Sequence, residues 1–157
     1  MADAQSTSME IKIVPYEPEL KDSVFAFTQK CFEKLGKNFE PEGRHECYND
    51  IERYYEKFFC LVEGNCIGGT VALKRLDEHT AELKSLYLSE ELRGKGLGKQ
   101  LLDKAIMSAR ELGFTSIVLD SMSKYTEALK LYKKAGFKHI DRYNDNAYAD
   151  VFMKLDI

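Results

Sequence analysis

The sequence predicts a three-layer α/β domain, with a mixed, mostly antiparallel central sheet flanked by helices. Short runs of β-branched and apolar residues alternate along the chain with longer segments whose apolar residues recur at helical spacing. Three expected strands follow one another across tight turns, whereas helices separate the later ones, and this order is typical of a layered α/β fold. At 157 residues the chain is long enough for one domain with a substantial core.

The N-terminal half is expected to hold one strand, two helices and a run of three antiparallel strands. The first helix carries Leu20, Val24 and Phe27 at helical spacing, and Gly36 ends it. Two apolar runs around Glu63-Gly64-Asn65 predict a hairpin. In order, we expect a strand at 11–15, a helix at 19–35, a loop at 38–44, a helix at 45–57, and strands at 58–62, 66–76 and 80–88.

The C-terminal half is expected to alternate helices and strands. A stripe of apolar residues from Leu97 to Leu112 predicts an amphipathic helix that ends at Gly113. After it we expect a buried strand at 116–119, a helix at 126–135 capped by Gly136, and two closing strands at 137–142 and 147–155.

The segment Leu92-Arg93-Gly94-Lys95-Gly96-Leu97-Gly98-Lys99 lies between an expected strand and the amphipathic helix. Its three glycines leave the backbone N–H groups uncovered, so that several of them can turn toward one anion. The start of the helix adds unpaired N–H donors and partial positive charge. Arg93, Lys95 and Lys99 bring cationic side chains to the same place. The segment therefore predicts a pyrophosphate-binding loop.

Three known kinds of segment can be compared with this loop. A Walker A loop is excluded, because Arg93 stands where its first glycine belongs and no Ser or Thr follows Lys99. The dinucleotide fingerprint matches at Gly94 and Gly96 but not at Lys99, and Asp120 stands about where such folds hold a ribose-binding acid. That interpretation stays open, as does a flexible basic turn without a ligand.

Arg93-Gly94-Lys95-Gly96-Leu97-Gly98 also satisfies the Arg/Gln-x-x-Gly-x-Gly/Ala pattern. Ala81-Glu82-Leu83-Lys84-Ser85-Leu86-Tyr87-Leu88 precedes it, and residues 126–137 end in Leu-Tyr…Gly-Phe. With these segments in this order and spacing, residues 9–157 resemble the GNAT superfamily of N-acetyltransferases. The resemblance implies a single domain that moves an acetyl group from acetyl-CoA to a primary amine without a metal.

The resemblance also implies which groups hold acetyl-CoA. In the family, the loop binds the pyrophosphate, and the fourth strand splays from the fifth so that its free backbone groups bind the pantetheine arm and the acetyl carbonyl. The side chains of that strand by themselves suggest only core packing. Carried onto this sequence, the residues implied for acetyl-CoA binding are Leu86, Tyr87, Leu88, Arg93, Gly94, Lys95, Gly96, Leu97, Gly98 and Lys99.

Two residues are candidates for proton transfer. Tyr132 stands where a tyrosine of the family protonates the departing thiolate, and a phenol of pKa about 10 can give a proton to a thiolate of pKa about 8.5 at small cost. Glu82 lies upstream of the carbonyl-binding segment and is the candidate base for the substrate amine. The alternative roles are core packing for Tyr132 and a solvated or ion-paired surface position for Glu82.

The acceptor is open at this stage. The family chooses its substrate largely through the segments that correspond to residues 36–44 and 141–148, both rich in polar and aromatic residues. A small-molecule amine is the first expectation, and a protein N-terminus or lysine, or a non-catalytic acyl-CoA-binding module, are the alternatives. Many members carry an Asn that contacts the CoA arm at the position of Tyr125, which puts that contact in doubt.

Composition bounds the remaining expectations. A net charge of −3 argues against nucleic acid as a partner, and no apolar run approaches the length of a membrane span. The four cysteines are expected to be free thiols in a reducing cytoplasm, although Cys60 and Cys66 could face each other across a hairpin. Residues 1–8 are expected to be a disordered N-terminus or a remnant of expression. We expect a homodimer through residues 148–153.

Overall fold

The computed structural model describes residues 10–157. It contains fourteen helices and strands in this range. They are β1 (Ile11–Pro15), the 3₁₀ helix η1 (Pro18–Leu20), α2 (Lys21–Lys34), the 3₁₀ helix η2 (Glu46–Asn49), α3 (Ile51–Tyr54), β2 (Lys57–Glu63), β3 (Cys66–Arg75), β4 (Thr80–Leu88), the 3₁₀ helix η3 (Glu90–Leu92), α4 (Leu97–Glu111), β5 (Ser116–Ser121), α5 (Thr126–Ala135), β6 (Lys138–His139) and β7 (Val151–Asp156). The predicted disordered segment, residues 1–8, lies outside the described residues.

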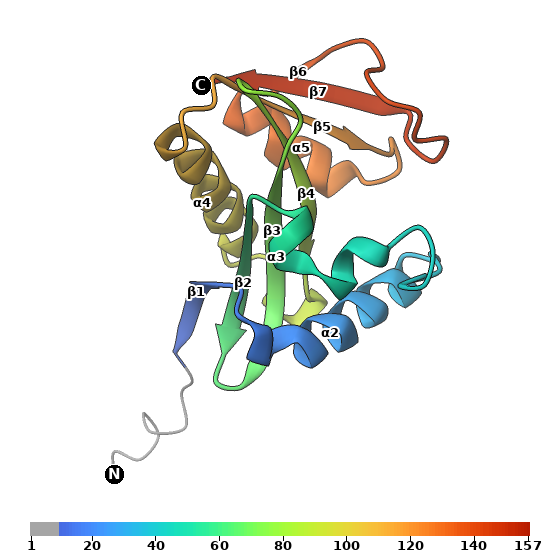
Figure 1. Cartoon of the computed structure of the whole chain (residues 1–157), viewed down its shortest axis with the longest axis vertical. Helices are drawn as coiled ribbons and strands as arrows, with labels where there is room; N and C mark the ends of the chain where they lie inside the picture. Colours follow the sequence, from blue (N-terminus) through green and yellow to red (C-terminus); the bar gives the residue numbers. More distant parts are fainter. Residues whose placement is uncertain (1–9) are drawn as a thin grey trace.

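Seven strands form one sheet in the order β1-β2-β3-β4-β5-β7-β6. Every neighbouring pair is antiparallel except β4 with β5, which is parallel. In Figure 1, β2, β3 and β4 run side by side, whereas β5 and β7 lie crosswise beyond them. The prediction of a mixed, mostly antiparallel sheet is confirmed.

Helices cover both faces of this sheet, so the three predicted layers are present. The larger core joins the sheet to α4 and α5 and includes Leu101, Leu102 and Tyr132. A smaller core on the opposite face includes Val24 of α2 and Ile51 of α3. Figure 1 shows α4 on one side of β2–β4 and α2 with α3 on the other.

The alternation of side chains along β2 explains how one strand serves both cores. Phe58 and Cys60 face the smaller core, whereas Phe59 and Leu61 face the larger one, and none of the four is more than 5% exposed. Fully burying a side chain of this size stabilises the fold by about 1.5–3 kcal/mol. A continuous apolar run is therefore the pattern that a strand buried on both faces requires.

A β-bulge interrupts β4 near its middle. Ala72 of β3 pairs with Lys84, but Thr70 pairs with Tyr87, so two residues of β4 stand opposite one residue of β3. Ser85 lies in the bulge with φ +55°, a left-handed conformation that is uncommon for a residue with a side chain. Beyond the bulge, Tyr87 lies on the α2 face of the sheet instead of the α4 face.

Two hydroxyl groups hold the bulge. The hydroxyl of Thr70 donates to the carbonyl oxygen of Ser85 at 2.6 Å, and the hydroxyls of Tyr48 and Ser85 are 2.6 Å apart. Thr70 is 1% exposed and Tyr48 is 4% exposed, so both contacts lie inside the protein. Because polar groups that are buried without partners are costly, these contacts stabilise the strained residue.

The pairing of β4 with β5 is short. It joins Thr80–Glu82 to residues 116–118, and the remainder of β4 has no partner on the β5 side within the described chain. Backbone groups point alternately to the two sides of a strand, so some N–H and C=O groups of residues 83–88 lack a ladder partner there. This opening is the splay that the resemblance implied.

The second helix is corrected by the structure. The single helix expected at 45–57 is replaced by η2 and the one-turn α3, because Asp50 leaves helical geometry with φ −145° and ψ 68°. Tyr55 is already extended, and the backbone N–H of Glu56 donates to the carbonyl oxygen of Leu73 at 2.8 Å. The chain therefore joins the sheet earlier than its helical pattern predicts.

The two closing strands are shorter than expected. In place of strands at 137–142 and 147–155, β6 has two residues and β7 begins at Val151. Arg142 holds the intervening segment in a folded turn, because its guanidinium donates to the carbonyl oxygens of Asn146 and Ala149, each at 2.9 Å. The segment 148–153 was expected to form a dimer interface. Val151–Met153 is buried within the sheet of its own chain, whereas Tyr148 is 62% exposed. The homodimer stays a prediction.

The close approach of β3 to β4 depends on Gly69. A Cβ atom there would lie 2.9 Å from Cδ1 of Leu101 and 3.1 Å from the carbonyl oxygen of Tyr87. We expect Gly69→Ala to lower the free energy of unfolding by about 1–3 kcal/mol, because the buried neighbours must shift. Gly43→Ala is the control, since its Cβ would meet nothing nearer than 3.8 Å. Urea denaturation of the two variants measures the difference, and equal stabilities would contradict this packing.

Candidate functional site

The glycine loop is anchored at both ends by buried leucines. Leu92 is 6% exposed and Leu97 is 7% exposed, and both belong to the larger core. The residues between them, 93–96, are all exposed. The sequence therefore fixes both ends of a short loop and leaves its backbone open to solvent.

The glycines give this loop its shape. Gly94 and Gly96 have φ +79° and +77°, and a Cβ at either would meet nothing within 4 Å. Glycine is therefore required there by the backbone conformation, and the space around it is free. Gly96 is also the residue before α4, so the unpaired N–H groups of that first turn adjoin the loop. This geometry fits an anion such as pyrophosphate.

The three cations of the loop differ in their surroundings. Lys99 pairs with Asp103 one turn along α4, with Nζ and Oδ2 2.6 Å apart. Among residues 10–157, neither Arg93 nor Lys95 has a carboxylate within 4.0 Å. Arg93 also lines a hollow of ≈ 170 Å³ with Cys31, Tyr87 and other residues of α2 and η3. Arg93 and Lys95 are thus the cations most available to an incoming anion.

The unpaired part of β4 leads directly into the glycine loop. Leu86 and Leu88 pack against the larger core, and the ring of Tyr87 lies 5.6 Å from that of Phe32 in an edge-to-face contact. Their side chains are therefore structural, as the sequence suggested. What the three residues leave for a ligand is backbone on the β5 side.

Tyr132 lies on α5 and is 7% exposed. Its ring contacts Phe137 at 5.7 Å between centroids, and no group of residues 10–157 forms a hydrogen bond with its hydroxyl. Burial, with a smaller effect of the Asp120 charge, raises the pKa of Tyr132 above its usual value. The hydroxyl thus stays protonated at physiological pH, as a proton donor requires, but it is a weaker acid in the unliganded protein than the sequence-based argument assumed.

Glu82 is buried, with 5% exposure, on the α2 face of the sheet. Its Oε2 accepts a hydrogen bond from the hydroxyl of Tyr143 at 2.6 Å and lies 3.4 Å from Nζ of Lys84. Lys84 also lies 3.6 Å from Asp120, whose carboxylate accepts from the amide of Asn144 at 2.6 Å. The structure thus places Glu82 in a network of one lysine and two carboxylates, at the edge of the opening.

Tyr143 and Asn144 are the site residues that sequence reasoning missed individually. Both lie in the segment between β6 and β7, which folds over the α2 face of β5 and β7, and the ring of Tyr143 contacts Phe152 at 5.6 Å. Burial and the hydrogen bond to Glu82 raise the pKa of Tyr143, so it serves as the donor of that bond. The only signal in the sequence was the polar and aromatic composition of residues 141–148.

The two segments expected to choose the acceptor meet across the site. The guanidinium of Arg44, from the connection between α2 and η2, lies 4.3 Å from the ring centroid of Tyr148, from the β6–β7 segment. Arg44 also pairs with Glu40 at 3.3 Å. These segments are about a hundred residues apart in sequence, and only the fold brings them together.

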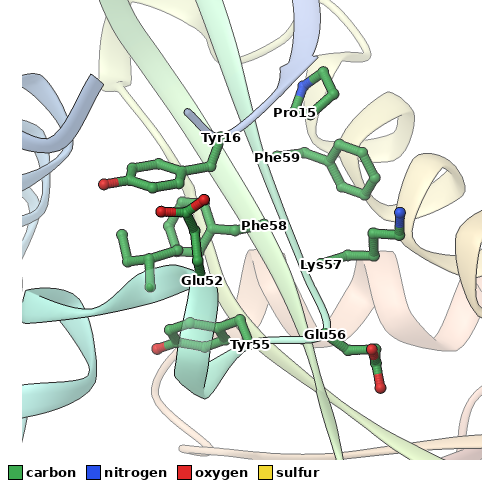
Figure 2. A pocket seen from close by; sticks show the side chains of 9 residues that line it. Pro15, Tyr16, Glu52, Tyr55, Glu56, Lys57, Phe58 and Phe59 are labelled. Carbon is green, nitrogen blue, oxygen red and sulfur yellow. The ribbon is translucent and has the colours of Figure 1, made fainter. Parts of the chain in front are cut away.

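A second hollow, of ≈ 220 Å³, lies where the start of β2 meets α3 and the end of β1. Figure 2 shows Tyr16, Phe58 and Tyr55 on one side of this strand, with Lys57 and Phe59 on the other. Tyr55 and Phe58 belong to the smaller core and Phe59 to the larger one, and none of the predicted site residues lines this hollow. This larger hollow is therefore separate from the opening of β4, where the predicted site residues lie.

The four cysteines are free thiols, as predicted. Cys60 and Cys66 do not face each other across the hairpin, because Cys60 pairs with Thr70 and Cys66 pairs with Glu63. Within residues 10–157, no cluster of three metal-ligating side chains is present. In the same range, no helix combines the length and the apolar character that crossing a lipid bilayer requires.

Comparison with known proteins agrees with this geometry. The profile described as "Acetyltransferase (GNAT) family" matches residues 22–137. The chain is 38% identical over 81 residues to the uncharacterized N-acetyltransferase YjgM of Escherichia coli, a match that covers 50% of this chain and 48% of that protein. It is 30% identical over 107 residues to N-acetylaspartate synthetase of Danio rerio, covering 64% of this chain and 38% of that protein. The matches thus span less than half of the length of these relatives.

Solved structures share the fold over nearly the whole chain. An acetyltransferase of the GNAT family from Staphylococcus aureus superposes with a TM-score of 0.86 at 24% identity, covering 94% of this chain and 99% of that one. The PaiA N-acetyltransferase of Thermoplasma acidophilum, solved in complex with coenzyme A, superposes with a TM-score of 0.78 at 21% identity, covering 95% and 100%. At these identities the likeness establishes the fold.

The two interpretations of the glycine loop predict different ligands, CoA for an acetyltransferase and NAD for a dinucleotide-binding protein. CoA should bind and raise the melting temperature, whereas NAD should not; a ligand at a hundred times its Kd stabilises by about 2.7 kcal/mol. Gly96→Val should abolish the shift with CoA, because it places a branched side chain in the loop. Gly113→Val is the control at the opposite end of α4, where φ is +89° and the space is equally open. A shift with NAD and none with CoA would favour the dinucleotide interpretation.

Proposed function

Because this chain belongs to the GNAT family of acetyltransferases, we propose that it moves an acetyl group from acetyl-CoA to the primary amine of a small molecule. The observation that carries the proposal is the continuity between the opening of β4 and the glycine loop, which follow each other along residues 83–98. Acetyl-CoA has a thioester at one end of the pantetheine arm and a pyrophosphate at the other. Adjacent sites for a carbonyl and for an anion match that arrangement.

In the proposed function, the loop supplies most of the affinity for the cosubstrate. Backbone N–H groups of residues 94–98 and the start of α4 receive the pyrophosphate, and Arg93 and Lys95 add charge. Hydrogen bonds that involve a charged partner are worth about 1.5–3 kcal/mol each. The loop binds the substrate and the transition state alike, so it acts on affinity and not on the chemical step.

The unpaired backbone of Leu86–Leu88 then positions the reacting carbonyl. An N–H group that points at the thioester oxygen stabilises the negative charge that develops there when the amine attacks. Because this backbone is held by the bulge at Ser85 and by packing of the leucines, it needs no reorganisation during the reaction. Backbone rigidity is therefore part of the proposed catalysis.

Two proton transfers complete the reaction. The acceptor ammonium must lose a proton before its nitrogen attacks the carbonyl carbon, and Glu82 receives that proton directly or through water. When the C–S bond breaks, the CoA thiolate takes a proton from the hydroxyl of Tyr132. In the unliganded protein the carboxylate of Glu82 accepts a hydrogen bond from Tyr143 and pairs with Lys84, so the acceptor must compete with these contacts.

Two observations support a small-molecule acceptor. The contact between Arg44 and Tyr148 joins the two segments that flank the acceptor face, which favours a compact ligand over an extended protein chain. Relatives named N-acetylaspartate synthetase also bear the name of a small-molecule product. Acetylation of a protein N-terminus or lysine is the second candidate, and a non-catalytic acyl-CoA-binding module is the third; release of CoA thiol with a panel of amines and peptides distinguishes them.

The proton donor provides the direct test of an enzymatic role. Tyr132→Phe keeps the ring and its contact with Phe137 but removes the hydroxyl, so folding and CoA affinity should change little. The value of kcat should fall by roughly 10²–10⁴-fold, the usual contribution of a positioned acid. Thiol release from acetyl-CoA, measured with the best amine of the panel, gives the rate.

Tyr54→Phe is the matched control, because Tyr54 is 37% exposed on α3 and lies among none of the proposed site residues. It should leave kcat unchanged. If Tyr132→Phe also retained full turnover where chemistry limits the rate, solvent would be the proton donor and Tyr132 a packing residue.

A further inference from the structure

Two lysines from distant segments flank the ring of Tyr125. Nζ of Lys37, in the connection between α2 and η2, lies 5.0 Å from the centroid of this ring and 5.3 Å from that of Phe32. Nζ of Lys124, in the connection between β5 and α5, lies 5.5 Å from the same Tyr125 centroid. The fold thus brings two positive charges to one aromatic ring beside the opening of the sheet.

These cations lack the partners that buried or clustered lysines usually have. Among residues 10–157, neither Lys37 nor Lys124 has a carboxylate within 4.0 Å. The hydroxyl of Tyr125 is buried and has no hydrogen-bond partner in the same part of the chain. The unpaired buried hydroxyl costs free energy, and an anionic ligand near this ring would give it and the two ammonium groups a partner.

The electrostatics of Lys37 agree with this geometry. Burial lowers the pKa of Lys37, and the charges of Lys124 and Arg44 lower it further, whereas Asp120 acts in the opposite direction. Like charges that repel one another are held together here by the packing of two separate segments, the α2–η2 connection and the β5–α5 connection. A bound anion would relieve that repulsion.

We propose that Lys37, Lys124 and the hydroxyl of Tyr125 bind a carboxylate group of the acceptor, which makes the acceptor class amino acids and other small amines that carry a carboxylate. The inference rests on the proposed acetyl transfer and names its substrate class. The amine of such a molecule would then face the acidic side of the site, where Glu82 and Asp120 share Lys84. A zwitterion matches this separation of positive and negative groups, whereas a diamine would meet two unpaired lysines.

The test compares acceptors that differ only in the carboxylate. Thiol release is measured with the proteinogenic amino acids against their α-carboxamides, and with γ-aminobutyrate against putrescine. The acids should give the higher kcat/KM. Equal rates for acids and amides, or faster reaction of the amides and of putrescine, would overturn the proposal.

Variants assign the preference to the named residues. Lys37→Gln and Lys124→Gln should each raise KM for the acids by roughly 10- to 100-fold, the usual effect of losing a charged hydrogen bond. KM for acetyl-CoA and the rates with carboxamides should stay unchanged. Lys133→Gln, which alters an exposed lysine of α5, is the control and should change none of these values. A rise in KM for acetyl-CoA instead would show that these lysines bind the cosubstrate, and would overturn the proposal.

A binding measurement separates this inference from the proposed function. The same acids and carboxamides are titrated calorimetrically into the CoA-saturated protein. Acid-selective binding that Lys37→Gln abolishes supports the carboxylate site even if no amine is acetylated, in which case only the proposed acetyl transfer fails. Turnover of amides with no binding of acids would have the opposite meaning, because the carboxylate site would be wrong and the acetyl transfer would stand.

Discussion

The departure of β4 from β5 after Glu82 is the constraint on which the site depends. A strand in the middle of a sheet normally satisfies its backbone on both sides, and leaving groups unpaired is costly unless water or a ligand replaces the partner. The protein stabilises this opening locally, through the bulge at Ser85 and the hydroxyls of Thr70 and Tyr48. Everything proposed for acetyl-CoA follows from that local rearrangement, because the glycine loop continues the same strand.

The two faces of the opening have different chemistry. On the face of α4 and α5, buried leucines surround Tyr132 and raise the pKa of its hydroxyl. On the face of α2, charged groups gather, with Glu82 and Asp120 around Lys84 and with Lys37 near Lys124. In the proposed function, apolar packing on one face suits a pantetheine arm and its thioester, and the charged groups on the other suit a polar amine. The sheet would then separate the two substrates until they meet at the opening.

Local pattern predicted most of this fold. The bounds of α5 agree with the helix expected at 126–135, since its cap at Gly136 and its apolar spacing are both local signals. The start of α4 at Leu97 agrees with the apolar stripe expected from Leu97 to Leu112, for the same reason. These features depend on residues that are neighbours in the sequence, so one sequence is sufficient to predict them.

Features that depend on distant neighbours could not be predicted. The face on which Tyr87 lies follows from one extra residue in β4, which no alternation of apolar residues reveals. The contact of Glu82 with Tyr143 and the grouping of Lys37 with Lys124 join segments that only the finished fold brings together. The break at Asp50 likewise reflects the pairing of Glu56 with β3, which overrides a helical pattern.

A crystal structure of the protein with bound CoA is the sharpest test of the proposed acetyl-CoA site. The pyrophosphate should accept hydrogen bonds from the backbone of residues 94–98, and the pantetheine arm should enter between β4 and β5 with the sulfur near the hydroxyl of Tyr132. A pyrophosphate elsewhere, or an arm that leaves the backbone of Leu86–Leu88 without a partner, would contradict it.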